Sequence, residues 1–297
     1  MLTMLRARWY DLIKAPFRGP KLLSIAGAGC AFAATIIAVF CPSLVSIALT
    51  FIAAFSIGAI LLGLIILTRL YGKVNDLHSA VSLYANIGLE HKIQSGLFLD
   101  GWSATPCFML FLYKCLAICK PQRILELGSG QTTKLLARYY QENPTAYICT
   151  IEHNADWLAA LRPQLAKSGN FHDCRHAPLV DRSFSCKMTN EKIHTLSYDI
   201  PPDVVQQPFN LILIDGPDNG PGSPYTREGF LQHVPGVLAQ SFTIVFDDTE
   251  REDERRMVAA FQRILHAHNI KSIRFELQGV KTQTVFCSID LWFLCSV

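Results

Sequence analysis

The sequence predicts an α/β domain with a doubly wound, mostly parallel sheet, preceded by two transmembrane helices. A run of 47 residues, 22–68, contains no Asp, Glu, Lys or Arg. Beyond residue 100, short apolar runs alternate with longer amphipathic stretches, which is typical of a parallel sheet covered by helices. The last two apolar runs flank a turn near Gly279, which favours an antiparallel pair of strands at the end of the domain.

The composition of the chain supports a membrane segment and excludes several classes of protein. Half of the 297 residues are hydrophobic and only 17% are charged, whereas about a quarter is usual for a soluble domain. These figures exclude a disordered chain, a collagen and a coiled coil. The net charge of +3 is too small to indicate nucleic-acid binding, and we expect no nucleic-acid partner.

The uncharged run is long enough for two spans. As one helix it would measure about 70 Å, more than twice a hydrocarbon core of about 30 Å. Pro42 divides it into Leu22–Cys41 and Leu44–Thr68, and each part can cross the bilayer. A cleavable signal peptide is the alternative, but a second apolar run follows the first at once. We therefore expect residues 22–68 to contact the lipid bilayer.

The flanking charges predict the orientation of these spans. Residues 1–21 carry five basic side chains and one acidic one, and Arg69 and Lys73 follow the second span. The positive-inside rule then places both ends in the cytoplasm. The ten cysteines form no C-x-x-C pair, which suits reduced thiols in that compartment. We divide the chain into a basic tail (1–21), a two-helix anchor (22–73), linker and lead-in helices (74–120) and the α/β domain (121–297).

The elements of this domain follow from apolar periodicity and from breaker residues. Pro106 opens a lead-in helix, Asn143-Pro144 ends the first helix of the α/β repeat, and Ser168-Gly169-Asn170 ends the second. The run FNLILID (209–215) is apolar throughout, as a central parallel strand should be. The expected strands are Arg123–Leu127, Ala146–Glu152, Phe209–Asp215, Phe242–Asp247, Ser272–Leu277 and Thr284–Phe293. The expected helices are 74–95, Thr105–Cys119, Thr132–Gln141, Ala155–Lys167, Gly229–Gln240 and Glu250–His268, with residues 178–207 as an irregular polar cap.

The first strand of the domain leads into the segment Glu126-Leu127-Gly128-Ser129-Gly130-Gln131-Thr132-Thr133. The two glycines allow a tight turn and a close approach of a ligand to the backbone, and the next helix offers its N-terminal amides. The second strand ends in Glu152, twenty-two residues beyond Gly130, where an acid can bind a ribose diol. Thr133 stands where a dinucleotide fingerprint has glycine or alanine. A plain strand–helix turn is the alternative interpretation.

These segments resemble the class I S-adenosylmethionine-dependent methyltransferases over residues 100–297. The resemblance rests on LELGSGQTT (125–133), TIEHN (150–154), LILIDGP (211–217) and IVFDDT (244–249). It implies a Rossmann-like fold with a terminal antiparallel strand and S-adenosyl-L-methionine as cofactor. By the same resemblance, Gly128, Ser129 and Gly130 pass under the cofactor, followed by Thr132 and Thr133 at the helix start. Glu126 would lie near its methionine end, Glu152 would bind its ribose and His153 would line the adenine pocket, unless His153 is a surface residue.

Three aspartates follow the next two strands, namely Asp215, Asp247 and Asp248. The arrangement resembles metal-dependent O-methyltransferases of the catechol and macrolide-sugar kinds, in which acids at these strand ends hold Mg²⁺. Catechol-type enzymes carry Asp-Asn after the later strand, whereas this chain has Asp-Asp. Two other interpretations stay open. Asp215 acts as a general base without a metal, or Asp215 and Asp248 merely cap a turn and a helix.

The sequence therefore predicts a membrane-anchored methyltransferase whose catalytic domain faces the cytoplasm. The expected acceptor is a hydroxyl of a glycan, a lipid-linked molecule or a small molecule, because three carboxylates converge and no Asn/Asp-Pro-Pro-Tyr motif is present. Two alternatives belong to other classes. One is a catalytically inactive cofactor-binding module at the membrane, and the other is a nicotinamide-dependent oxidoreductase.

Overall fold

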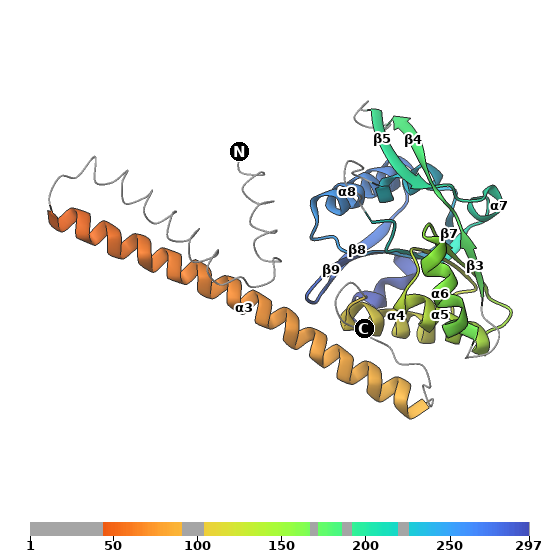
Figure 1. Ribbon diagram of the computed structural model, residues 1–297, viewed down its shortest axis with the longest axis horizontal. Helices are drawn as coiled ribbons and strands as arrows, with labels where there is room; N and C mark the ends of the chain where they lie inside the picture. Colours follow the sequence, from red (N-terminus) through yellow and green to blue (C-terminus); the bar gives the residue numbers. More distant parts are fainter. Residues whose placement is uncertain (1–43, 91–103, 167–171, 186–191, 219–225, 297) are drawn as a thin grey trace. The chain divides into compact units, whose positions relative to one another are not determined.

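The computed structural model describes residues 44–90, 104–166, 172–185, 192–218 and 226–296. The chain divides into two units, residues 1–74 and residues 75–297 (Figure 1). The predicted basic tail and the first predicted span, Leu22–Cys41, lie outside the described residues.

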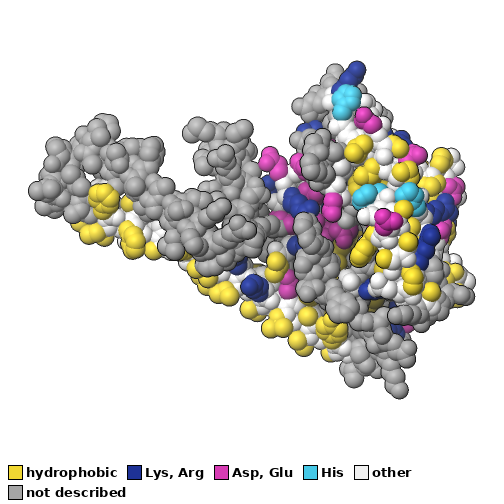
Figure 2. Space-filling model, viewed as in Figure 1, with side chains coloured by type: hydrophobic (Ala, Val, Ile, Leu, Met, Phe, Trp, Pro, Cys, Tyr) yellow, Lys and Arg dark blue, Asp and Glu magenta, His cyan; other side chains and the backbone are white. Residues whose placement is uncertain are grey.

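Helix α3, Leu44–Glu90, contains the second predicted span. Within the described part of the chain it is the one helix long and apolar enough to cross a membrane, over Leu49–Asn86. Large apolar side chains such as Phe55 and Leu64 are exposed along it, as the yellow surface in Figure 2 shows. The separate linker helix expected at 74–95 is instead a continuation of α3, because no proline interrupts the chain between the two.

The second unit is built on a seven-stranded sheet with the order β3-β2-β1-β6-β7-β9-β8. Five strands are parallel, whereas β9 runs antiparallel to both of its neighbours. The strands are β1 (Arg123–Leu127), β2 (Tyr147–Glu152), β3 (Asp173–His176), β6 (Phe209–Ile214), β7 (Leu238–Phe246), β8 (Ser272–Gln278) and β9 (Thr282–Ser288). This is the predicted doubly wound, Rossmann-like sheet with its terminal antiparallel strand, and it confirms the expected fold class.

Helices cover both faces of the sheet. On one face, Met257, Val258 and Phe261 of α8 pack with Leu125 and Ile212 of the central strands. On the other face, α4 and α5 bury side chains that alternate with these along the strands, such as Ile124 and Leu211. The helices are α4 (Pro106–Cys119), α5 (Gln131–Glu142), α6 (Ala155–Ala166), α7 (Pro202–Val205) and α8 (Glu252–Ala267). The strands are thus buried on both sides, which explains their nearly continuous apolar sequences.

Three sequence predictions are wrong in this region. The cap at 178–207 is regular over much of its length, because β4 (Leu179–Ser185) and β5 (Lys192–Tyr198) form an antiparallel hairpin. The helix predicted at Gly229–Gln240 is a 3-10 helix, η1 (Thr226–His233), and β7 begins already at Leu238, because Pro235 prevents an α-helix from continuing. The last strand ends at Ser288, and the 3-10 helix η2 (Ile289–Ser296) follows it.

Candidate active site

The carboxyl ends of four parallel strands bring the predicted site residues to one edge of the sheet. Between β1 and β6 the strand order reverses, because the chain adds β2 and β3 on one side of β1 and then returns to the other. Such a switch point is where open α/β sheets bind their ligands. The backbone amide of Asp215 donates to Leu127 O (2.9 Å), and that of Asp247 donates to Ile214 O (3.0 Å). The glycine loop and the aspartates therefore share this edge.

The two loop glycines have different roles. Gly128 has φ +91°, and a Cβ there would lie 2.8 Å from the backbone carbon of Asp215, so only glycine fits between the strands. At Gly130 a Cβ would meet nothing within 4 Å, so the loop is open on that side. The Gly130 amide donates to Thr133 Oγ1 (2.8 Å) at the start of α5. The space beside Gly130 is therefore free to receive a ligand.

Glu152, at the end of β2, holds the glycine loop and the loop after its own strand. Its Oε2 accepts from the amide (2.9 Å) and the hydroxyl (2.8 Å) of Ser129, and its Oε1 accepts from the Asn154 amide (2.8 Å). His153 Nδ1 lies 3.1 Å from the same Oε1. Burial alone would raise the pKa of Glu152, but these hydrogen bonds hold that pKa below its ordinary value. Glu152 is thus ionised and hydrogen-bonded to the glycine loop.

Glu126, on the last part of β1, contacts hydroxyl groups of α5 and β2. It is fully buried, and its Oε2 accepts from the hydroxyls of Thr133 (2.8 Å) and Thr150 (2.6 Å). Burial raises the pKa of Glu126 to about 7 despite these bonds and one from Thr132. Thr132 and Thr133 are buried too. Through Thr133, which accepts from the Gly130 amide, Glu126 is connected to the glycine loop.

Two residues near the loop, His172 and Trp157, were not among the predicted site residues. The hydroxyl of Thr150 lies 2.7 Å from His172 Nε2, a buried imidazole whose pKa burial lowers to about 4. Trp157, on the first turn of α6, donates from Nε1 to the carbonyl of Ser129 (3.0 Å), and Asn154 Oδ1 caps that turn. Asn154 stands three residues before Trp157, and this capping pattern was the one signal in the sequence.

The three aspartates meet as predicted. One carboxylate oxygen from each of Asp215, Asp247 and Asp248 lies within 4.8 Å of the other two. Asp247 and Asp248 are buried, whereas the side chain of Asp215 is 25% exposed. The capping interpretation is wrong for Asp248, because α8 is preceded by Arg251 as its N-cap and Asp248 forms an ion pair with Arg251 (3.0 Å).

Positive side chains surround this aspartate cluster. Arg227 of η1 is almost fully buried, and its Nη2 lies 3.4 Å from Asp248 and 4.0 Å from Asp215. Lys281 Nζ lies 3.4 Å from Asp248 Oδ1 and 4.0 Å from Asp247 Oδ2. Burial and the neighbouring charge of Asp247 raise the pKa of Asp215 well above its ordinary value. Lys281 helps to hold the pKa of Asp247 below its ordinary value, against the effect of burial.

A magnesium ion does not fit this arrangement of side chains. Carboxylate oxygens are suitable ligands, but Mg²⁺ requires them about 2.1 Å away in an octahedral set. The ammonium of Lys281 faces oxygens of Asp247 and Asp248, and the guanidinium of Arg227 faces Asp248 and Asp215. The oxygens that would bind the ion therefore already face fixed cations.

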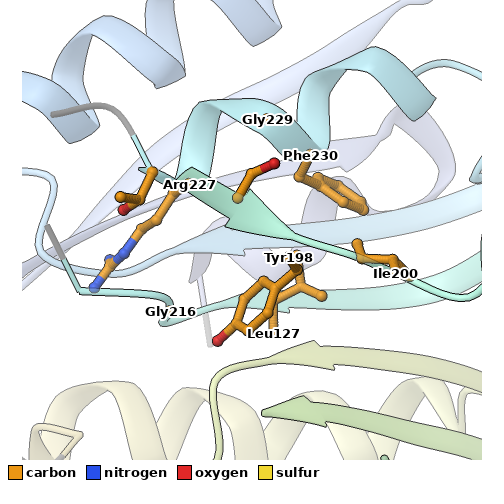
Figure 3. A pocket seen from close by; sticks show the side chains of 9 residues that line it. Leu127, Tyr198, Ile200, Gly216, Arg227, Gly229 and Phe230 are labelled. Atoms are coloured by element: carbon orange, nitrogen blue, oxygen red, sulfur yellow. The ribbon is translucent and has the colours of Figure 1, made fainter. Parts of the chain in front are cut away.

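A small pocket adjoins the cluster beneath the β4–β5 hairpin. Tyr198, Leu127, Gly216 and Arg227 are among the residues that line it (Figure 3). The ring of Tyr198 lies against His153, with ring centroids 5.8 Å apart. Burial raises the pKa of Tyr198 well above its ordinary value, so its phenol stays neutral. The hairpin thus contributes an aromatic wall between Glu152 and the aspartates.

No protein-family model matches the sequence, and a search of curated proteins found no match. Among solved structures, the chain is similar to the O-methyltransferase from Bacillus cereus in complex with SAH (14% identity, TM-score 0.46, covering 72% of this chain and 90% of that one). It is also similar to a putative O-methyltransferase from Klebsiella pneumoniae (17% identity, TM-score 0.47, covering 74% of this chain and 98% of that one). A third similar structure is the O-methyltransferase TomG from Streptomyces achromogenes in complex with SAM (12% identity, TM-score 0.46, covering 74% of this chain and 98% of that one).

Proposed function

We propose that this chain is an S-adenosylmethionine-dependent methyltransferase that methylates a hydroxyl group. The observation that carries the proposal is the loop of β1, whose open side at Gly130 lies next to the ionised Glu152 at the end of β2. The hydroxyl of Ser129 donates to Glu152 Oε2 at 2.8 Å, and a ribose hydroxyl can make the same bond in its place. The resemblance of the motifs to class I methyltransferases implies that the ligand of this site is S-adenosyl-L-methionine.

The protein's part in methyl transfer is alignment and proton removal. The methyl carbon leaves the sulfonium sulfur, which keeps the bonding electron pair, and forms a bond to the acceptor oxygen in line. The acceptor's proton goes to a carboxylate, and Asp215 is the candidate base because its side chain is the most exposed of the three aspartates. Burial in a cluster of like charges makes Asp215 a stronger base than a free carboxylate. Magnesium has no step in this scheme.

The membrane part of the proposal rests on α3 and on the charge pattern of the sequence. Two spans with a cytoplasmic catalytic domain suit a methyl donor made in the cytosol. An enzyme at a bilayer is well placed to methylate a lipid-linked or glycan acceptor, or a small molecule near that surface. Reporter fusions after Thr68 and at the C-terminus should both report cytoplasm, and one at Ser43 should report the opposite side. An external C-terminus would contradict the charge argument.

Calorimetry on the full chain in detergent tests the cofactor. We expect one site for S-adenosylhomocysteine and no binding of NAD. Gly130→Val should abolish that binding while the protein stays folded, because its side chain enters open space rather than the strands. Gly128→Val is the matched control, since it clashes with Asp215 and should unfold the domain instead. Binding of NAD, or unaltered binding by Gly130→Val, would overturn the assignment.

Turnover is a separate question from binding. Radiolabelled methyl donor incubated with the full chain and membrane extract should label a product, which fractionation assigns to lipid, glycan or protein. Asp215→Asn should lose this transfer and keep the binding of S-adenosylhomocysteine. If the wild-type protein binds the cofactor but labels nothing, the inactive binding module becomes the better interpretation.

A further inference from the structure

Lys281 reaches the aspartate cluster from the turn between β8 and β9. Its side chain is only 15% exposed. Asp248 Oδ1 accepts no hydrogen bond within the described part of the chain, and it faces Nζ at 3.4 Å. Nζ also lies 4.0 Å from Asp247 Oδ2. The ammonium therefore lies where a divalent cation bound by these two aspartates would lie.

The position of Lys281 is fixed by hydrogen bonds between its turn and the loop that carries the aspartates. The Thr249 amide donates to Thr282 O (2.8 Å), and the Thr282 amide donates to Glu250 Oε2 (2.7 Å). Within the turn, the Gly279 amide donates to Lys281 O (3.0 Å). Thr249 follows Asp248 directly, so the cation and the anions are attached to one hydrogen-bonded unit.

Three cations already face the cluster without an added ion. Arg227, Arg251 and Lys281 all contact Asp248, and Arg227 also lies 3.8 Å from the buried carboxylate of Glu254. The amide of Gln283 satisfies Asp247 Oδ1 at 2.7 Å. A divalent ion would have to displace Lys281 and would lie close to Arg227, and the repulsion between these cations is strong in a poorly solvated site.

We propose that Lys281 is the built-in cation of this site, that it replaces a divalent metal ion, and that methyl transfer is therefore metal-independent. The inference rests on the proposed function and deepens it. Lys281 is a positioning residue in this scheme. It holds Asp247 and Asp248 in place, so that Asp215 is the carboxylate left to face the acceptor.

Manganese titration of the full chain tests this role, with bound Mn²⁺ followed by electron paramagnetic resonance. We expect no specific site in the wild-type protein. Lys281→Met removes the charge at similar size and should bind one Mn²⁺ at least about tenfold more tightly, because carboxylate charge sets the affinity for hard cations. Lys281→Arg, the matched control, keeps the charge and should not gain the site. A merely structural role for Lys281 would give no gain of metal in either variant.

The outcomes are distinct. A wild-type site for Mn²⁺ that Asp247→Asn abolishes would overturn the inference, and so would the absence of any gain in Lys281→Met and Lys281→Gln. Binding of S-adenosylhomocysteine by each variant reports whether it is folded. If the wild-type protein fails to bind that ligand, the proposed function fails, whereas the metal titration still decides the role of Lys281.

Discussion

Two groups of carboxylates lie at the same edge of the sheet and are stabilised in opposite ways. Glu126 and Glu152 contact hydroxyl and amide groups, and neither forms an ion pair with Lys or Arg in the described part of the chain. The three aspartates instead meet Arg227, Arg251 and Lys281. Burial raises the pKa of Glu126 to about 7 against the lowering effect of its hydroxyl donors, whereas Lys281 and Arg227 help to keep Asp247 ionised.

The difference in neighbouring charge fits the different roles that we propose for the glutamates and the aspartates. We propose that the two glutamates border a site for a cationic sulfonium ligand, and such a site gains nothing from the Lys and Arg side chains that they lack in the described part of the chain. A site that must hold several carboxylates close together requires positive charge, since like charges repel strongly where water is scarce. The predictions below test whether the two groups differ in this way, beginning with the largest expected effect.

Removing the central cation of the aspartate cluster should cost the most stability. Arg227→Met removes a buried cation that faces Asp215, Asp248 and Glu254, and we expect a loss of about 3–5 kcal/mol in the free energy of unfolding. Arg138→Met is the control, because its pair with Glu142 is exposed and should contribute less than about 1 kcal/mol. Chemical denaturation followed by tryptophan fluorescence measures both. Equal losses of unfolding free energy in Arg227→Met and Arg138→Met would contradict the idea that the aspartates depend on buried cations.

Glu126 should make stability fall as the pH rises. Its pKa is about 7 in the folded protein and 4.5 as the ordinary value, so the folded state holds the proton more tightly. The free energy of unfolding should therefore drop between pH 4.5 and 7 by about 3 kcal/mol and change little above. Glu126→Gln, which mimics the protonated acid, should remove this slope. Denaturation curves at several pH values measure the effect, and an unchanged slope in the variant would exclude Glu126 as its source.

Glu152→Ala should weaken cofactor binding more than it weakens the fold. The substitution removes the acceptor for Ser129 and Asn154, and with it the proposed partner of the ribose. We expect a loss of about 1.5–3 kcal/mol in binding free energy, as for hydrogen bonds to a charged group. Calorimetry with S-adenosylhomocysteine measures it, and Glu142→Ala on the exposed face of α5 serves as the control. Unaltered affinity would remove Glu152 from the site.

Trp157→Phe should have the smallest effect. It removes one hydrogen bond to the carbonyl of Ser129 and keeps the aromatic ring, so the affinity for the cofactor should fall by about 1 kcal/mol or less. The wild-type indole should also change its fluorescence when the loop binds a ligand. A titration compares the two proteins, and a loss as large as that of Glu152→Ala would make Trp157 a ligand contact.

The difference between the two groups also explains what the sequence could predict. The glycine loop and Glu152 follow consecutive strands, so their proximity follows from the strand order alone. The aspartates were predicted to meet for the same reason. Their cations were not predicted, because Arg227 lies on a 3-10 helix that begins before the helix expected at Gly229–Gln240, and Lys281 lies in a turn that was expected only to join two strands. The hairpin β4–β5 was missed because β5 reverses the usual alternation, with Thr195 and Ser197 buried and Leu196 between them exposed.

The strand order has a consequence for synthesis of the chain. Strand β1 pairs with β6, so the centre of the sheet cannot form until residue 214 has left the ribosome. Asp247 and Asp248 emerge next, and the lysine that neutralises them follows more than thirty residues later. Contacts of such long sequence separation form slowly. During that interval Arg227 and Arg251 are already present but Lys281 is not, so the acidic edge is only partly compensated and its burial is disfavoured until the turn that carries Lys281 has been translated.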